Sequence, residues 1–151
     1  MVNDLDGIYS GGRHHAVAGL HPCGLARLSE LLLFLTLTIW FEGRDQNEVC
    51  MVKIAQVALN RMGSDGDIAK VILAPAQFSW VPEKMINGVL KPEHRPNRES
   101  AAWLKSERAA KTAIYSGKFA GTHFHATWME KPKSWSKLKW LTTCDQHHFY
   151  Y

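Results

Sequence analysis

One apolar stretch constrains the fold of this chain more than any other feature, and it ends in a carboxylate. Residues 31–41 read LLLFLTLTIWF and are followed directly by Glu42. At helical spacing Glu42 lies three residues after Ile39 and seven after Leu35, so it falls on the same stripe as apolar side chains. A carboxylate on a stripe that faces a core has to be paired, neutralised or used in chemistry.

The apolar run is too short to serve as a membrane anchor. A spanning helix needs roughly 18 uninterrupted apolar residues, and this run leads into Glu42 and Arg44 without a small-residue cleavage site. We therefore expect no signal peptide and no stable membrane insertion, and we expect the protein to be made in the cytoplasm.

Length and composition fit one compact domain. The chain has 151 residues, of which 46% are hydrophobic. Residues 1–24 hold five of the eleven glycines and show no apolar periodicity. We predict a flexible N-terminal tail over residues 1–24 and a single domain over residues 25–151.

The charge is concentrated near the C-terminus. Residues 101–151 contain eight Lys and Arg against three Asp and Glu, whereas residues 1–100 contain ten against eleven. Such a segment suits a polyanionic partner, which could be nucleic acid, a membrane surface or an acidic cell-wall polymer. A solvated basic face without a partner explains the same pattern equally well.

The cysteines do not form a recognisable framework. Cys23, Cys50 and Cys144 are odd in number and contain no Cys-x-x-Cys pair. We predict reduced thiols whose role is packing, as in a cytosolic product.

Helical patterns come first and strand-like patterns follow. Helices are predicted over residues 25–42, 50–62 and 67–73, and from a cap at Asn97 to about Tyr115. Residues 74–98 hold four of the six prolines and predict a long irregular segment, which is more often functional than idle. Strands are predicted in THFHATW, KLKWLTT and HHFYY. The expected class is α+β, mainly helical with a small C-terminal antiparallel sheet.

Six segments together resemble one known family. They are LTIWFEGRDQ, IAQVALNRM, APAQFSW, AAKTAIYSG, GTHFHA and HHFYY, in that order. The combination resembles the SleB-like cell wall hydrolase family, the spore-cortex lytic enzymes and related phage lysins, over about residues 28–151. The chain departs from the family pattern in CDQHHFYY, where a glycine-asparagine pair usually precedes the histidine.

The resemblance implies a function as well as a fold. It implies a lysozyme-like or transglycosylase-like domain that cleaves the glycan strands of peptidoglycan, with Glu42 as the catalytic acid/base and no cofactor. We expect a monomer that acts on the bacterial cell wall and not on nucleic acid, of the kind that phages use as endolysins. The alternative is a non-catalytic peptidoglycan-binding or virion structural module, and the intact motif around Glu42 favours the enzyme.

The chemistry of glycoside cleavage agrees with this role for Glu42. A proton must reach the leaving oxygen, and partial burial keeps a glutamic acid protonated near neutral pH. Trp40 and Phe41 precede Glu42, and a helix that ends at Gly43 would place the negative end of its dipole there. The alternative is a structural ion pair of Glu42 with Arg44 or Arg61.

Other polar and aromatic residues are candidates for substrate binding. In AQFSW, Gln77, Ser79 and Trp80 would line the cleft, unless they only form a capped turn over a buried Phe78. Strand alternation directs His123 and His125 to one side of THFHATW. The predicted substrate-binding residues are Gln77, Ser79, Trp80, His123, His125, His148 and Tyr150. A zinc site made of these histidines with His147 or His148 is the alternative, whereas we expect no metal.

The number of carboxylates bears on the reaction type. Glycoside hydrolases recruit a second carboxylate roughly 5 to 9.5 Å from the acid. Asp45 and Glu48 follow Glu42 closely along the chain, and Glu83 and Glu93 belong to no motif. A lytic transglycosylase needs a single acid, so the sequence favours that reaction over a muramidase.

Overall fold

The computed structural model describes residues 22–151, with side chains described from Arg27 onward. Residues 1–21 of the predicted tail lie outside the described residues, and residues 22–24 belong to the first turn of a helix. The helices are α1 (Pro22–Gly43), α2 (Glu48–Arg61), α3 (Ile68–Leu73), α4 (Trp80–Lys84) and α5 (Ala101–Tyr115), with two 3₁₀ turns, η1 (Pro92–His94) and η2 (Lys133–Trp135). The strands are β1 (Met85–Ile86), β2 (Val89–Leu90), β3 (His123–Ala126), β4 (Trp140–Cys144) and β5 (His147–Tyr150).

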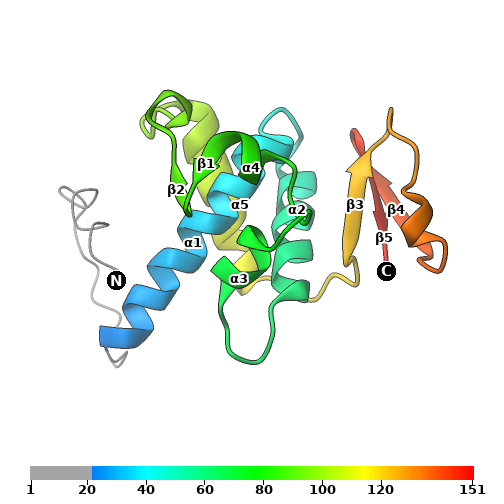
Figure 1. Cartoon of the computed structure of the whole chain (residues 1–151), viewed down its shortest axis with the longest axis horizontal. Helices are drawn as coiled ribbons and strands as arrows, with labels where there is room; N and C mark the ends of the chain where they lie inside the picture. Colours follow the sequence, from blue (N-terminus) through cyan, green and yellow to red (C-terminus); the bar gives the residue numbers. More distant parts are fainter. Residues whose placement is uncertain (1–21) are drawn as a thin grey trace.

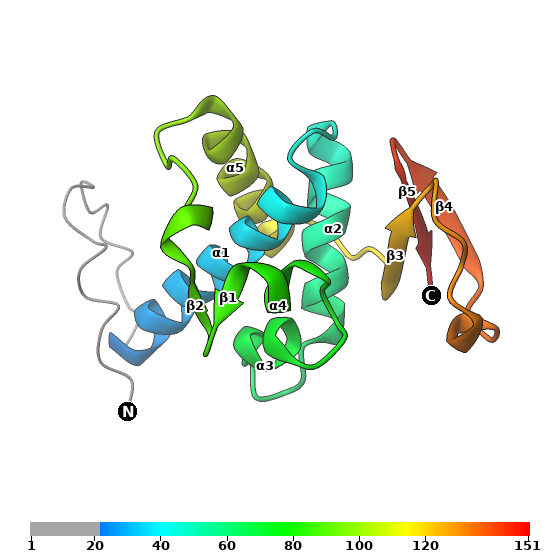
Figure 2. The ribbon, with the colours of Figure 1, turned by 45° about the horizontal axis from the view of Figure 1, so that its top comes forward.

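The predicted α+β class is confirmed. The helices form one part of the molecule, and the C-terminal strands form a small sheet beside α2 (Figure 1). This sheet is antiparallel with the order β3-β5-β4, so β5 is its central strand. The short β1–β2 hairpin lies on the other side of the helical part (Figures 1 and 2).

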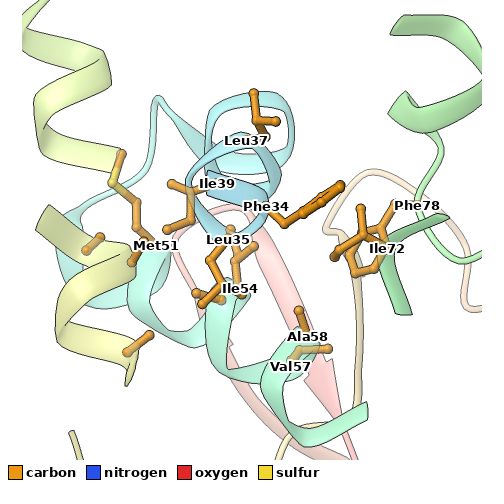
Figure 3. Packing of buried hydrophobic residues seen from close by; sticks show 14 of the residues in the cluster. Phe34, Leu35, Leu37, Ile39, Met51, Ile54, Val57, Ala58, Ile72 and Phe78 are labelled. Carbon is orange, nitrogen blue, oxygen red and sulfur yellow. The ribbon is translucent and has the colours of Figure 1, made fainter. Parts of the chain in front are cut away.

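The core is built around α1, which packs against both α2 and α5. Leu35 and Ile39 of α1 are fully buried and lie close to Met51 and Ile54 of α2 (Figure 3). Burying a side chain of this size contributes about 1.5–3 kcal/mol to stability. Across residues 22–151, no helix has the length and apolar character needed to cross a bilayer.

Two threonines lie inside the apolar stripe of α1. The buried hydroxyls of Thr36 and Thr38 donate hydrogen bonds to the carbonyls of Leu32 (2.7 Å) and Phe34 (2.8 Å). Each polar group is therefore satisfied within its own helix, which allows these residues to face the core.

A glycine sets how closely the end of α1 approaches α2. Gly43 is the last residue of α1, and a Cβ atom at this position would collide with the side chain of Ile54. The chain then turns and starts α2, whose first turn is capped by the Asn47 side chain, which accepts a hydrogen bond from the Cys50 amide (3.0 Å). The glycine therefore allows Glu42 to lie at a tight junction between two helices.

The predicted cap of the last helix is wrong. Ser100, not Asn97, caps α5, because the Ser100 side chain accepts from the Trp103 amide (3.2 Å). Asn97 instead accepts from the Glu99 amide in the preceding turn (3.0 Å). Both residue types are good caps, and the backbone conformation decided which of them was used.

The proline-rich segment is more ordered than the predicted irregular one. It contains α4, the β1–β2 hairpin and η1. Asn87 and Gly88 both have positive φ (52° and 76°), as in a two-residue hairpin turn of the Asn-Gly type. The Asn-Gly pair carried this signal in the sequence.

The prediction of reduced thiols is wrong for two of the three cysteines. Cys50 of α2 and Cys144 of β4 form a disulfide, with their Cα atoms 5.5 Å apart. They are separated by 94 residues in sequence, so their spacing gave no indication of the pairing. The bond ties the C-terminal sheet to the helical part.

Replacing both cysteines by alanine should lower the free energy of unfolding by about 2–4 kcal/mol, because the disulfide closes a long loop in the unfolded chain. Urea denaturation with and without a reducing agent measures this. Reduction should destabilise the wild type by a similar amount and should not affect the Cys50→Ala/Cys144→Ala variant. Equal unfolding midpoints for reduced and oxidised wild type would contradict the expectation.

Candidate active site

Glu42 lies in a cleft of about 720 Å³. One wall is the end of α1 with the turn that follows it, residues 40–46. A second wall comes from the segment before α5, residues 93–97, together with Lys84 and Ser100. The third wall belongs to the C-terminal part of the chain and consists of Trp128, Gln146 and His147.

Aromatic contacts support the end of α1 on both sides of Glu42. The ring of Phe41 stacks on that of Trp80, with centroids 4.8 Å apart and planes 24° apart. Trp40 packs against Trp103 of α5 at 5.9 Å. These pairs add to the burial of α1 and hold Glu42 at the cleft wall.

Burial changes the protonation of Glu42. Loss of hydration raises its pKa from 4.5 to about 7. The negative end of the α1 dipole lies at Gly43 and acts in the same direction. Near neutral pH a large fraction of this side chain is therefore a neutral carboxylic acid that can donate a proton.

Neither of the two candidate arginines pairs with Glu42. The Arg44 guanidinium lies over the Trp40 ring, 4.8 Å from its centroid. Arg61 donates to the carbonyl of Thr122 (2.6 Å) and to the Gln77 side chain (3.3 Å). Within the described part of the chain, the Glu42 carboxyl group thus has no ion-pair partner to lower its pKa.

His147 occupies the third wall of the cleft as a neutral imidazole. His147 is 4% exposed, and this burial lowers its pKa. The nearby His125 lowers the pKa further, whereas Asp145 raises it. Its Nδ1 atom is buried without a hydrogen-bond partner among residues 22–151. Most buried nitrogen atoms in proteins have a hydrogen-bond partner, so His147 Nδ1 is an exception.

Hydrogen bonds join the third wall to the first. Two hydrogen bonds connect Gln46 with Gln146. The backbone N–H of Gln146 donates to Gln46 Oε1 (2.9 Å), and Gln46 Nε2 donates to the side-chain Oε1 of Gln146 (3.2 Å). The Asn47 amide donates to the Asp145 carboxylate (2.6 Å). Together with the nearby disulfide, these contacts set the position of Gln146 and His147 relative to Glu42.

The AQFSW residues do not line this cleft. Trp80 is buried beneath Phe41, and so supports the wall from behind. Ser79 is exposed at the start of α4, and its side chain makes no capping hydrogen bond. Gln77 is exposed and lines a separate hollow of about 440 Å³ together with Arg61 and His123.

The remaining predicted residues gather on the sheet. Strand alternation in β3 is confirmed, because Phe124 packs against Phe149 while His125 faces Tyr150. His125 Nε2 and the Tyr150 hydroxyl are 3.0 Å apart, and the rings of His125 and His148 are 5.5 Å apart. These three residues do not line the Glu42 cleft. No three His, Cys, Asp or Glu side chains converge as a metal-binding group in the described region.

Several cleft residues were not among the predicted site residues. Trp128 is 71% exposed at the cleft, where its ring presents a flat apolar face to any ligand. His94 and Arg95 come from the proline-rich segment, which the sequence had marked as functional without singling them out. The sequence marked His147 only as a possible zinc ligand, and Gln146 carried no local signal; contacts across the fold bring both to the cleft.

Comparison with known proteins identifies a family for most of the chain. A family model described as Cell Wall Hydrolase matches residues 45–150. The match starts three residues after Glu42 and includes the second and third walls of the cleft. No curated protein and no solved structure matches the chain.

The raised pKa of Glu42 predicts a pH-dependent effect on stability. Between pH 4.5 and about 7, Glu42 keeps its proton in the folded state but has lost it in the unfolded state. The free-energy cost of burying the charged carboxylate is therefore absent at low pH and complete above pH 7. Glu42→Gln should therefore be more stable than wild type by roughly 3 kcal/mol at pH 8 and about equally stable at pH 4. Urea unfolding at both pH values checks this, and a stability difference that does not depend on pH would show that Glu42 is not buried as an acid.

Proposed function

Because this chain belongs to the cell wall hydrolase family, we propose that it is a peptidoglycan-degrading glycosidase with Glu42 as its general acid/base. The observation that carries the proposal is a carboxylic acid whose pKa is raised to about 7 at the wall of an open cleft. A proton donor of this kind is what glycosidic bond cleavage needs at neutral pH.

A single acid/base of this kind is sufficient for a lytic transglycosylase. Glu42 donates its proton to the glycosidic oxygen while the bond from that oxygen to the anomeric carbon of muramic acid breaks. The carboxylate then takes the proton of the muramic acid 6-hydroxyl, whose oxygen bonds to the same anomeric carbon. The proton count balances, Glu42 is regenerated, and a pKa near 7 suits both transfers.

The other carboxylates near Glu42 support this choice over a muramidase. Glu48 is paired with Arg108 (3.1 Å), and Glu83 is paired with Lys84. Asp45 and Glu93 line the cleft, but both are exposed, and in the described structure no hydrogen bond or ion pair holds either carboxylate toward the cleft. A nucleophile or base has to be held in position, so Glu42 is the better-prepared group.

The cleft also offers groups that suit a glycan strand. The exposed indole of Trp128 presents a flat face for a sugar ring. The side-chain amides of Asn97 and Gln146 supply hydrogen-bonding groups around the same space. Of the substrate-binding residues expected from the sequence, Gln77 and His123 in the separate hollow remain candidates for an outlying sugar.

The resemblance to SleB-like spore-cortex enzymes and phage lysins supports an endolysin role. We propose that the protein is made in the cytoplasm and acts as a monomer on the wall. The Cys50–Cys144 disulfide supports a working environment outside the reducing cytoplasm, because such bonds persist under oxidising conditions.

Glu42→Gln should keep the fold and lower lytic activity by about 10²- to 10⁴-fold, because an amide cannot donate a proton as a carboxylic acid does. Turbidity loss of permeabilised cells measures the lysis. Glu107→Gln is a matched control on α5, where Glu107 pairs with Lys111 and does not line the cleft. Equal activity of the two variants would reject Glu42 as the acid.

The products should carry 1,6-anhydromuramoyl ends. Mass spectrometry of digested peptidoglycan separates these from reducing ends, which are heavier by one water. Asp45→Asn and Glu93→Gln should each lose far less activity than Glu42→Gln. Reducing ends, together with a loss in one of these variants as large as in Glu42→Gln, would instead identify a muramidase and its second carboxylate.

A further inference from the structure

The C-terminal sheet has two faces of different character. Its inward face packs Phe124 and Phe149 toward the helices, and Cys144 is tied to α2 on the same side. The strand register places a second set of residues on the outward face: His123, His125, Trp140, Thr143, His148 and Tyr150. Phe149 belongs to the hydrophobic core and Phe124 and Cys144 pack against it, so the outward set lies on the side of the sheet away from the core, with His123 at its margin near Arg61 of α2.

Part of the outward face is covered by the segment that connects β3 to β4. The ring of Trp135 in η2 packs edge-on against the rings of His123 and Tyr150, with centroid distances of 4.8 Å and 6.0 Å. Lys131 lies over the Tyr150 ring at 5.1 Å and donates to the carbonyl of Leu138 (2.8 Å). The histidines of β3 are therefore packed under this segment, whereas the face along β4, an edge strand, stays open.

The open part is aromatic. Trp140 at the start of β4 is 60% exposed, and its Nε1 donates to the Thr143 hydroxyl (3.3 Å). Thr143 is in turn linked to His148 Nδ1 at 2.6 Å. Lys139 and the exposed Tyr151 pair through two backbone hydrogen bonds of 3.0 Å next to the Trp140–Tyr150 pair, so they lie at the same end of the sheet as Trp140, with their side chains on the opposite side of the strands.

The same region is strongly basic. Residues 131–144 contain four lysines and no acidic residue. Lys133, Lys137 and Lys139 are exposed, and none has an ion-pair partner in the described chain. By contrast, Lys70 and Lys111, on the helical part, are paired with Asp65 and Glu107. We call the set Lys133, Lys137, Lys139, Trp140 and Tyr151, which belongs to the connection before β4 and to both sides of this end of the sheet, the lysine–aromatic surface.

We propose that the lysine–aromatic surface binds an anionic cell-wall polymer built from phosphodiester-linked sugars or polyols. Three ammonium groups without carboxylate neighbours attract a chain of phosphates. The exposed indole and phenol rings offer apolar faces to the carbon skeleton between the phosphates. None of the five residues lines the Glu42 cleft, so the surface can hold the wall while the cleft acts on a glycan strand.

This inference concerns binding and does not rest on the chemistry of Glu42. Binding is therefore measured in the Glu42→Gln background, so that the wall is not digested. The probes are purified walls that carry a phosphodiester polymer, and the same walls after that polymer has been stripped with hydrofluoric acid. Co-sedimentation at low salt gives the affinity for each.

Lys133→Ala/Lys137→Ala/Lys139→Ala should lower the affinity for intact walls by about tenfold. The matched control, Lys70→Ala/Lys111→Ala/Lys118→Ala, removes the same charge from α3, α5 and the loop after α5, and should change the affinity by less than about twofold. Trp140→Ala leaves the charge unchanged and should also weaken binding. Stripped walls should bind the parent and the lysine variant equally weakly.

Three results would overturn the proposal. An equal loss in both lysine variants would mean that net charge alone matters. Undiminished binding of the parent to stripped walls would show that the polymer is not the ligand. Tighter binding to duplex DNA or anionic vesicles than to intact walls would assign the surface to another polyanion. Activity of the lysine variant with an intact Glu42 on stripped walls tests catalysis separately and should be unchanged.

Discussion

Everything at the cleft depends on how α1 ends. The helix is mostly apolar over residues 31–41, where it packs against α2 and α5, and Glu42 occupies the point where that packing gives way to an open cleft. The carboxyl group is thus desolvated by the same burial that stabilises the helix, and its pKa rises to about 7 as a consequence. The stability of the core and the acidity of the site have one physical origin.

The junction after α1 maintains this arrangement. Gly43 lets the helix end lie against Ile54, whose side chain would have to shift to admit a Cβ atom at this position, and Asn47 caps the start of α2 four residues later. The Phe41–Trp80 and Trp40–Trp103 pairs hold the end of α1 from two directions. Glu42 consequently has little freedom to move out to solvent, where its pKa would return to an ordinary value.

The opposite wall reaches the cleft only through tertiary contacts. Gln146 lies 100 residues after Gln46, yet the Gln46 side chain donates to the Gln146 side chain and accepts from the Gln146 backbone amide. The disulfide and the contact between Asp145 and the Asn47 amide act at the same junction. Because these three links are adjacent, they hold the sheet that carries His147 on its inward side against α2.

The sequence by itself determined a helix that carries Glu42 at its end region, the α+β class, the C-terminal strands and the alternation of His123, Phe124 and His125, because each of these follows from local periodicity and residue type. It also identified Glu42 as an anomalous carboxylate, since a charge on an apolar stripe is visible without a structure. Tertiary structure alone decided that Cys50 meets Cys144, that Trp80 is buried behind the cleft, and that Trp128 and His147 face it. The physical reason is that packing brings together residues far apart in the chain, and nothing in their local pattern records which distant partner they will meet.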